Sequence, residues 1–233
     1  GDYSMVIDGT TADGKPYSGY RILFVDGELT HTWEFTYGDQ TISDISLGIL
    51  FSDYVSYMDK LPVSDRHDVA DDRQKHDSQF VVVDKYITGL TEQFKALQTE
   101  NGWTEIETAA CILAFTQAIP YAYDSKTHGE EEYWNFPVET LYLGKGDCED
   151  TSILTSAIYK GMGYKSALLI MRGHMAVGIL GSDLSGYSEF SKQYTTFSSS
   201  GYYYGETTST SYKLGEYPDD LIYVDRIIID VET

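Results

Sequence analysis

The sequence contains few cysteines, few basic residues and no long apolar run. Its two cysteines among 233 residues, Cys111 and Cys148, allow at most one intramolecular bridge and no disulfide framework. Its 16 Lys and Arg against 37 Asp and Glu give a formal net charge of −21. Such a surface repels nucleic-acid phosphates and anionic membranes, so no nucleic-acid partner is expected and cationic partners or divalent cations fit better. No apolar stretch approaches the roughly 18 residues of a membrane-spanning helix, so we expect no such segment.

The composition favours an extracellular or cell-surface protein. The chain contains 21 tyrosines, and the stretch from Gly181 to Tyr212 is rich in Ser, Thr, Tyr and Gly, as is common on secreted proteins. The sequence begins with Gly1 instead of methionine, which suggests that a signal or membrane anchor preceded it in the full-length protein.

The chain divides into a β-rich part and a part with helices. Short apolar runs between Tyr20 and Leu50 are interrupted by the turn signals Asp26-Gly27 and Gly38-Asp39, which predicts antiparallel hairpins. The stretch SDRHDVADDRQKHD that follows is charged and indicates a linker. We therefore expect an N-terminal β-rich extension and linker over residues 1–80 and a second domain over residues 81–233.

The second domain is predicted to be α+β. Apolar residues at helical spacing predict one helix, and Thr104 with Glu107 forms a capping box that predicts the start of the next. A third helix is expected to begin close to Cys148 and to end at Gly161 or Gly163. The apolar runs SALLIM and HMAVGIL, separated by Arg172-Gly173, then predict two strands joined by a tight turn.

The stretch GKGDCED places Cys148 at the predicted start of the third helix. Unpaired N–H groups and the helix dipole stabilise a thiolate there, and this offsets the neighbouring acids. Asp147 and Glu149 alternate with Cys148 along the chain, so we expect their side chains to diverge from the sulfur. The alternative interpretation is that Cys148 is a small buried residue, as we expect for Cys111.

His174 is the histidine best placed to act as the base of Cys148. It follows the predicted tight turn and opens a strand, so it can face the end of a helix packed across the sheet. The other histidines lie in the β-rich part, the charged linker or a polar loop: His31, His67, His76 and His128. A purely structural role is the alternative for His174.

An acid to orient His174 is predicted from strand pairing. If YYYGETT returns antiparallel beside the His174 strand, Leu180 lies opposite Gly201 and His174 lies near Glu206 or its neighbour. Asp183 is closer in sequence, but it lies beyond the far end of the same strand. Glu206 is therefore the predicted acid, and an exposed strand carboxylate is its alternative interpretation.

These residues carry a resemblance to a known family. The stretch YWNFPVETLYLGKGDCEDTSILTSAIYKGMGY followed by GHMAVGI, with the preceding Ile119-Pro120-Tyr121 and Asp124, resembles the transglutaminase-like cysteine peptidases, in particular the bacterial and archaeal branch with a Gly-Asp-Cys-Glu-Asp motif. The resemblance covers roughly residues 85–215. It implies a papain/transglutaminase-like core, with helices packed on an antiparallel sheet, behind the N-terminal β-rich extension.

The resemblance also implies a chemistry and a set of site residues. Cys148 would be the nucleophile, His174 the base and Glu206 the orienting acid, although many relatives carry an Asp closer to the histidine. The reaction would be acyl transfer from a protein or peptide substrate through a thioester, resolved by water in a peptidase or by an amine in a transglutaminase. Gln117 is the predicted side-chain donor to the oxyanion beside the Cys148 N–H.

Two further expectations concern bound ions and the class of protein. In some relatives that cleave surface adhesins, acids beside the cysteine bind calcium, and Asp147 and Glu149 could hold Ca²⁺ here. No other cofactor is expected, because the sequence has no His-Glu-x-x-His, P-loop or Rossmann pattern. The alternative from another class is a papain-like domain that serves as a non-catalytic cell-surface binding module.

Overall fold

The computed structural model describes residues 3–10 and 16–23 as backbone, together with residues 27–69, 72–180, 201–216, 218 and 226–231. In chain order the elements are β1 (Tyr3–Thr10), β2 (Pro16–Leu23), β3 (Glu28–Tyr37), β4 (Gln40–Leu50), α1 (Phe51–Met58), the 3₁₀ turn η1 (Val63–Asp65), α2 (Arg73–Ser78), α3 (Lys85–Asn101), α4 (Glu105–Gln117), α5 (Asp124–Thr127), α6 (Pro137–Leu143), α7 (Cys148–Met162), β5 (Ser166–Met171), β6 (His174–Leu180), β7 (Tyr202–Gly205) and β8 (Arg226–Val231).

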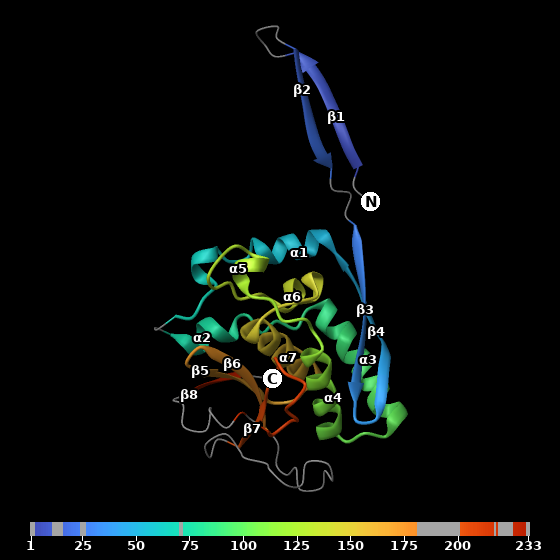
Figure 1. Ribbon diagram of the computed structural model, residues 1–233, viewed down its shortest axis with the longest axis vertical. Helices are drawn as coiled ribbons and strands as arrows, with labels where there is room; N and C mark the ends of the chain where they lie inside the picture. Colours follow the sequence, from blue (N-terminus) through green and yellow to red (C-terminus); the bar gives the residue numbers. More distant parts are fainter. Residues whose placement is uncertain are drawn as a thin grey trace.

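Two antiparallel hairpins precede the helices. β1 pairs with β2, and β3 pairs with β4. Figure 1 shows the first hairpin projecting beyond the helical body, whereas the second lies along α3 and α4. The predicted turn at Gly38-Asp39 is confirmed, and Gly38 has a φ of 58° that glycine adopts without steric cost. The other predicted turn cannot be compared, because Asp26 lies outside the described residues.

The β3–β4 hairpin shares one hydrophobic core with the helices that follow. The ring of Phe115 on α4 receives edge contacts from Trp33 and Phe35 on β3 and from Phe94 on α3, with ring centroids 5.4, 5.7 and 5.5 Å away. Such edge-to-face pairs add to the free energy of burial. The core therefore extends across residue 80, where the sequence predicted the end of the N-terminal extension.

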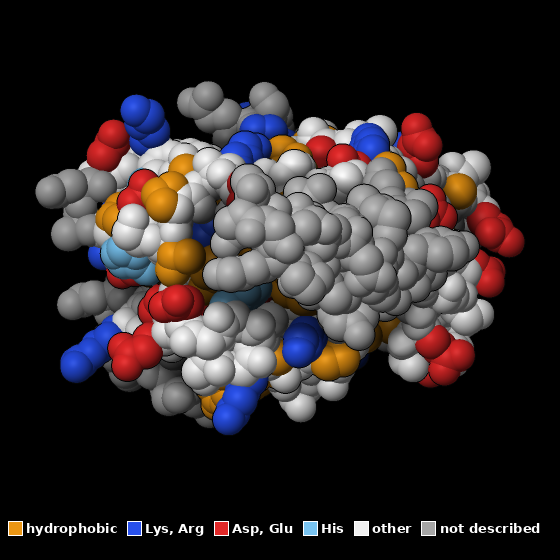
Figure 2. Space-filling view, turned by 90° about the horizontal axis from the view of Figure 1, so that it is seen from above, with side chains coloured by type: hydrophobic (Ala, Val, Ile, Leu, Met, Phe, Trp, Pro, Cys, Tyr) orange, Lys and Arg blue, Asp and Glu red, His pale blue; other side chains and the backbone are white. Residues whose placement is uncertain are grey.

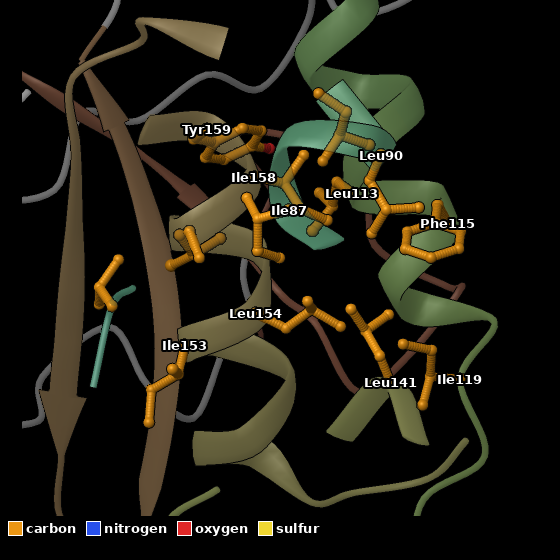
Figure 3. Close-up of a cluster of buried hydrophobic side chains, with 14 of the residues drawn as sticks. Ile87, Leu90, Leu113, Phe115, Ile119, Leu141, Ile153, Leu154, Ile158 and Tyr159 are labelled. Carbon is orange, nitrogen blue, oxygen red and sulfur yellow. The ribbon is translucent and has the colours of Figure 1, made fainter. Parts of the chain in front are cut away.

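Helix α7 runs through the centre of this core. Figure 3 shows its side chains Leu154, Ile158 and Tyr159 towards apolar side chains of α3 and α4, whereas Ile153 lies on the side of the strands. All four are fully buried, and the Tyr159 hydroxyl donates a hydrogen bond to the Ala109 carbonyl at 2.9 Å. Because α7 is packed on several sides, the position of its first residue is strongly constrained.

Local sequence signals account for the ends of the long helices. Thr104 and Glu107 form the predicted capping box at the start of α4. Asp84 accepts hydrogen bonds from two backbone N–H groups at the start of α3. α7 begins at Cys148 and ends before Gly163, whose φ is 84°, so its predicted bounds are confirmed with Gly163 as the terminating glycine.

The second sheet is antiparallel with the order β7-β6-β5-β8. The strands predicted from SALLIM and HMAVGIL are β5 and β6, joined by the Arg172-Gly173 turn. α7 packs against both strands, and every residue of β5 is buried. Helices on an antiparallel sheet, preceded by β-rich hairpins, confirm the predicted α+β fold class. Strand β8, formed by the run RIIIDV, was not predicted.

The charged stretch predicted to be a linker contains a fully buried arginine. Arg66 donates to Glu139 Oε2 at 2.8 Å and to the Trp134 carbonyl at 3.0 Å. Its remaining N–H groups donate to the carbonyls of Leu61, Tyr57 and Met58. The guanidinium also lies over the Tyr133 ring, 4.5 Å from its centroid. This arginine therefore ties the segment after α1 to the region that precedes α7.

Basic side chains are dispersed on the coloured part of the face that Figure 2 shows. Figure 2 shows Lys and Arg scattered singly over the part of that face drawn in colour, without a continuous basic patch. Among the helices that the structure describes, none combines the length and hydropathy needed to cross a membrane. The second observation agrees with the expectation that the sequence contains no membrane-spanning segment.

Replacing Arg66 by methionine is expected to destabilise the fold strongly. The substitution leaves Glu139 buried and without its cation, which typically costs about 3–5 kcal/mol. The free energy of unfolding, measured by urea denaturation, should fall by that amount.

Arg73 supplies the matched control. It pairs with Asp68 at the surface, where the two side chains are 23% and 48% exposed, and such pairs contribute about 0–1 kcal/mol. Arg73→Met should therefore leave the urea midpoint nearly unchanged. Equal losses in the two variants would refute a special role for Arg66.

Candidate active site

The segment before α7 holds Cys148 at the helix N-terminus. The Gly146 N–H donates to the Pro120 carbonyl at 3.2 Å, and the Gly146 carbonyl accepts from the Ala122 N–H at 2.9 Å. A side chain at Gly146 would not fit, because its Cβ would lie 2.6 Å from the Cβ of Asp150. Glycine is therefore required two residues before the cysteine, where the backbone passes close to the first turn of α7.

The thiol of Cys148 contacts an acid. Its Sγ donates to Glu149 Oε2 at 2.9 Å, so the expectation that Glu149 diverges from the sulfur is wrong. Burial raises the pKa of Cys148, and the negative charge of Glu149 raises it further. In this arrangement the thiol therefore keeps its proton at neutral pH.

Cys148 and His174 line the same small pocket, of 130 Å³, together with Trp134 and Met171. His174 is the first residue of β6, as the sequence predicted. Its Nε2 lies 2.9 Å from Glu206 Oε2. The other ring nitrogen, Nδ1, has no hydrogen-bond partner among the described residues.

Glu206 lies immediately beyond β7. Leu180 pairs with Tyr202, so the register differs by one residue from the predicted pairing of Leu180 with Gly201. The strand ends at Gly205, which pairs with Val177, and this places the Glu206 side chain against His174 as expected. Asp183, the rival acid, lies outside the described residues.

Four donors converge on the Glu206 carboxylate. Oε2 accepts from His174 and from the Tyr204 hydroxyl at 2.7 Å, and Oε1 accepts from the N–H and hydroxyl of Thr208 at 3.0 and 2.6 Å. Burial alone would raise the pKa of Glu206, but the bond and charge of His174 with the bonds from Thr208 and Tyr204 lower it to about 2. The carboxylate therefore remains ionised although it is buried.

Sequence reasoning missed Tyr204 and Thr208. The Tyr204 hydroxyl also lies 3.3 Å from His174 Nε2, so it touches both members of the pair. Nothing distinguishes Tyr204 from Tyr202 and Tyr203 in the sequence, except that it lies two residues before the predicted acid. Alternation along a strand could have suggested that Tyr204 and Glu206 share a face.

Gln117 does not occupy the predicted position. Its Nε2 donates to the carbonyls of Glu206 and Tyr212 at 2.7 and 2.8 Å. Both amide hydrogens are thereby engaged, and none is left for an oxyanion at Cys148. The predicted oxyanion role of Gln117 is therefore contradicted by this geometry: the residue supports the backbone that carries Glu206.

The acids beside Cys148 belong to a buried cluster. Asp124, Asp147 and Asp150 each offer an oxygen within 4.8 Å of the others, and Asp124 forms a second such group with Glu132 and Glu149. Burial with neighbouring negative charge raises the pKa of Asp124 to about 7 and that of Asp147 to about 8. Asp124 Oδ1 and Asp147 Oδ1 are buried and have no hydrogen-bond partner among the described residues. The predicted metal residues Asp147 and Glu149 thus lie in two overlapping clusters of carboxylate oxygens.

Comparison with known families places this site in context. Residues 86–180 match a family model described as a transglutaminase-like domain. This part of the chain is a transglutaminase-like domain. The match includes Cys148 and His174 and ends before Glu206. No curated protein matches the sequence. The match supports a thiol-dependent enzyme of the papain-like superfamily.

The low pKa of Glu206 predicts a specific acid dependence of stability. A carboxylate whose pKa falls on folding stabilises the fold above its unfolded pKa, here 4.5, and loses that contribution as pH falls towards about 2. The shift corresponds to about 3 kcal/mol. The difference in unfolding free energy between wild type and Glu206→Gln should therefore be largest above pH 5 and should shrink between pH 4.5 and 2. A difference independent of pH would refute the assignment.

Proposed function

We propose that this protein is a thiol-dependent acyl-transfer enzyme, and specifically a cysteine peptidase, in which Cys148 is the nucleophile, His174 the base and Glu206 the orienting acid. The observation that supports the proposal most is the 2.9 Å contact between His174 Nε2 and Glu206 at the pocket that Cys148 lines, within a transglutaminase-like domain. A thiol, an imidazole and a buried carboxylate in this order are the parts that such catalysis requires.

The acylation step uses both nitrogens of His174. Nδ1 takes the thiol proton, and Nε2–H donates to the ionised Glu206, which stabilises the imidazolium. The sulfur attacks the carbonyl carbon of a peptide bond, so a C–S bond forms and the carbonyl π electrons move to oxygen. When they return, the C–N bond breaks and the imidazolium gives its proton to the leaving amine. The product is a thioester on Cys148.

The second step decides the class of enzyme. His174 removes a proton from water, the resulting hydroxide attacks the thioester carbonyl, and the C–S bond breaks to release the acid and the thiol. In a transglutaminase an amine would replace water at the same point. The substrate is a protein or peptide in both cases.

The main alternative is a non-catalytic cell-surface binding module. The hydrogen bond from Cys148 to Glu149 favours it, because an adjacent carboxylate keeps the thiol protonated. A binding module has no need of a reactive thiolate. The two functions therefore predict opposite behaviour of the same sulfur atom.

A divalent cation would fit the acid cluster. The donors are carboxylate oxygens, which suit Ca²⁺, and two of them, on Asp124 and Asp147, are buried without partners. Asp147 and Glu149 would hold the ion, with Asp124 as the residue shared by both groups of oxygens. The cation would supply positive charge that offsets the negative field of Glu149 at the thiol. An extracellular or cell-surface location, where free calcium is abundant, belongs to the same proposal.

The reactivity of Cys148 tests the enzyme against the binding module. Iodoacetamide alkylation is measured against pH in a Cys111→Ala background, with and without calcium, because Cys111 is buried in the core. For an enzyme we expect rapid alkylation well below pH 8 with calcium present, slowed at least tenfold at neutral pH by His174→Ala. A thiol that titrates near 8.5 or above, with an alkylation rate that His174→Ala does not change, would refute the enzyme and favour the binding module.

Calcium binding has its own measurement. A ligand that binds only the folded state raises the melting temperature, so excess calcium should stabilise the wild type by several degrees. Asp124→Asn should lose most of that shift, whereas Asp44→Asn, at an exposed position on β4, should keep it. Wild-type protein whose melting temperature does not respond to calcium would refute the cation site.

A further inference from the structure

An acyl-transfer site needs donors for the oxyanion, and Gln117 does not supply one. The backbone N–H of Cys148 is one donor at the helix N-terminus. A second donor should come from a side chain beside the sulfur whose hydrogen is not already engaged. A role for such a donor rests on the acyl-transfer function proposed for Cys148.

Tyr121 is held beside the nucleophile by backbone pairing. It forms an isolated parallel bridge with Gly146, two residues before Cys148. Gly146 also bonds to the two residues that flank Tyr121. Its N–H donates to the Pro120 carbonyl at 3.2 Å, and its carbonyl accepts from the Ala122 N–H at 2.9 Å. The position of Tyr121 is therefore linked to the turn that presents the sulfur.

The hydroxyl of Tyr121 is available as a donor. Its side chain is 47% exposed, and the hydroxyl has no hydrogen-bond partner among the described residues. Partial burial of the side chain and the negative charges of Cys148, Asp147 and Glu149 raise the pKa of Tyr121, so the proton is retained at neutral pH. The ring also packs edge-on against Tyr123, with centroids 5.2 Å apart, which limits its rotation.

Other hydroxyls around the site are already engaged. Tyr204, whose hydroxyl also interacts with the charge of Cys148, donates to Glu206. Ser152 and Thr151 on α7 contact the Thr207 hydroxyl at 3.1 and 2.9 Å and also donate to backbone carbonyls. Recruiting any of these groups would break an existing bond, whereas recruiting Tyr121 breaks none.

We infer that Tyr121 is a catalytic residue whose hydroxyl donates a hydrogen bond to the oxyanion formed when Cys148 attacks the substrate carbonyl. The tyrosine keeps its proton throughout. Its hydroxyl stabilises the negative charge on the substrate oxygen while the C–S bond forms. That charge disappears when the carbonyl re-forms and the leaving group departs. The phenolic O–H of Tyr121 takes the place that the sequence predicted for Gln117.

The test compares a reaction that places a tetrahedral oxygen where the oxyanion would form with one that does not. N-acetylglycinal, a small aldehyde, reacts at its carbonyl carbon with the sulfur of Cys148 to give a tetrahedral hemithioacetal, whose oxygen takes the oxyanion position and accepts hydrogen bonds there, whereas alkylation by iodoacetamide at its CH₂ carbon creates no such oxygen. The aldehyde affinity is measured as protection of Cys148 from alkylation, in the Cys111→Ala background with calcium in excess. Tyr121→Phe should weaken the affinity of Cys148 for the aldehyde at least tenfold and leave the rate of alkylation by iodoacetamide unchanged.

Tyr123→Phe is the matched control, since it removes a hydroxyl from the neighbouring ring, which is 65% exposed. It should bind the aldehyde as the wild type does. Unchanged aldehyde affinity in Tyr121→Phe would overturn the inference, and so would an equal loss in both reactions, because the hydroxyl would then act on the thiolate. A wild-type Cys148 that reacts with neither probe would instead overturn the proposed function itself.

Discussion

The buried ion pair of Arg66 and Glu139 is the constraint on which the organisation of this domain depends. Both side chains are fully buried, and isolated charges of this kind are tolerated only when every donor is used. Arg66 bonds the Trp134 carbonyl, and the next residue, Asn135, donates from its N–H and side-chain amide to Asp150 in the first turn of α7. A continuous path of hydrogen bonds thus connects the segment after α1 to the start of the cysteine helix.

The site itself contains carboxylates in opposite electrostatic states. Glu206 is surrounded by donors, which lower its pKa despite burial. Asp124 and Asp147 are buried among other acids with unpaired oxygens, which raises their pKa. Glu206 therefore remains an anion that can orient an imidazole. The cluster that contains Asp124 and Asp147 is instead suited to binding a cation. The Cys148 thiol donates to Glu149, which shares a group of carboxylate oxygens with Asp124.

Much of the fold was predictable because its signals are local. The capping box of Thr104 and Glu107, the apolar spacing in α3 and the glycine that ends α7 depend on residues within a few positions of one another. The Arg66 segment was misjudged for the opposite reason. A charged stretch is normally solvated, but Arg66 within this one is buried because its partner Glu139, 73 positions further along the chain, lies in the core.

The sequence by itself determined where the chemistry could lie: a cysteine at the start of a helix, a histidine at the start of a strand and an acid near the returning strand. Tertiary structure alone decided what surrounds each group. Glu149 turned towards the sulfur, Gln117 was committed to two backbone carbonyls, and Tyr121 was left with an unengaged hydroxyl among the described residues beside Cys148. The reason is physical: backbone conformation follows mainly from near neighbours, whereas side-chain hydrogen bonds and pKa depend on groups that only folding brings together.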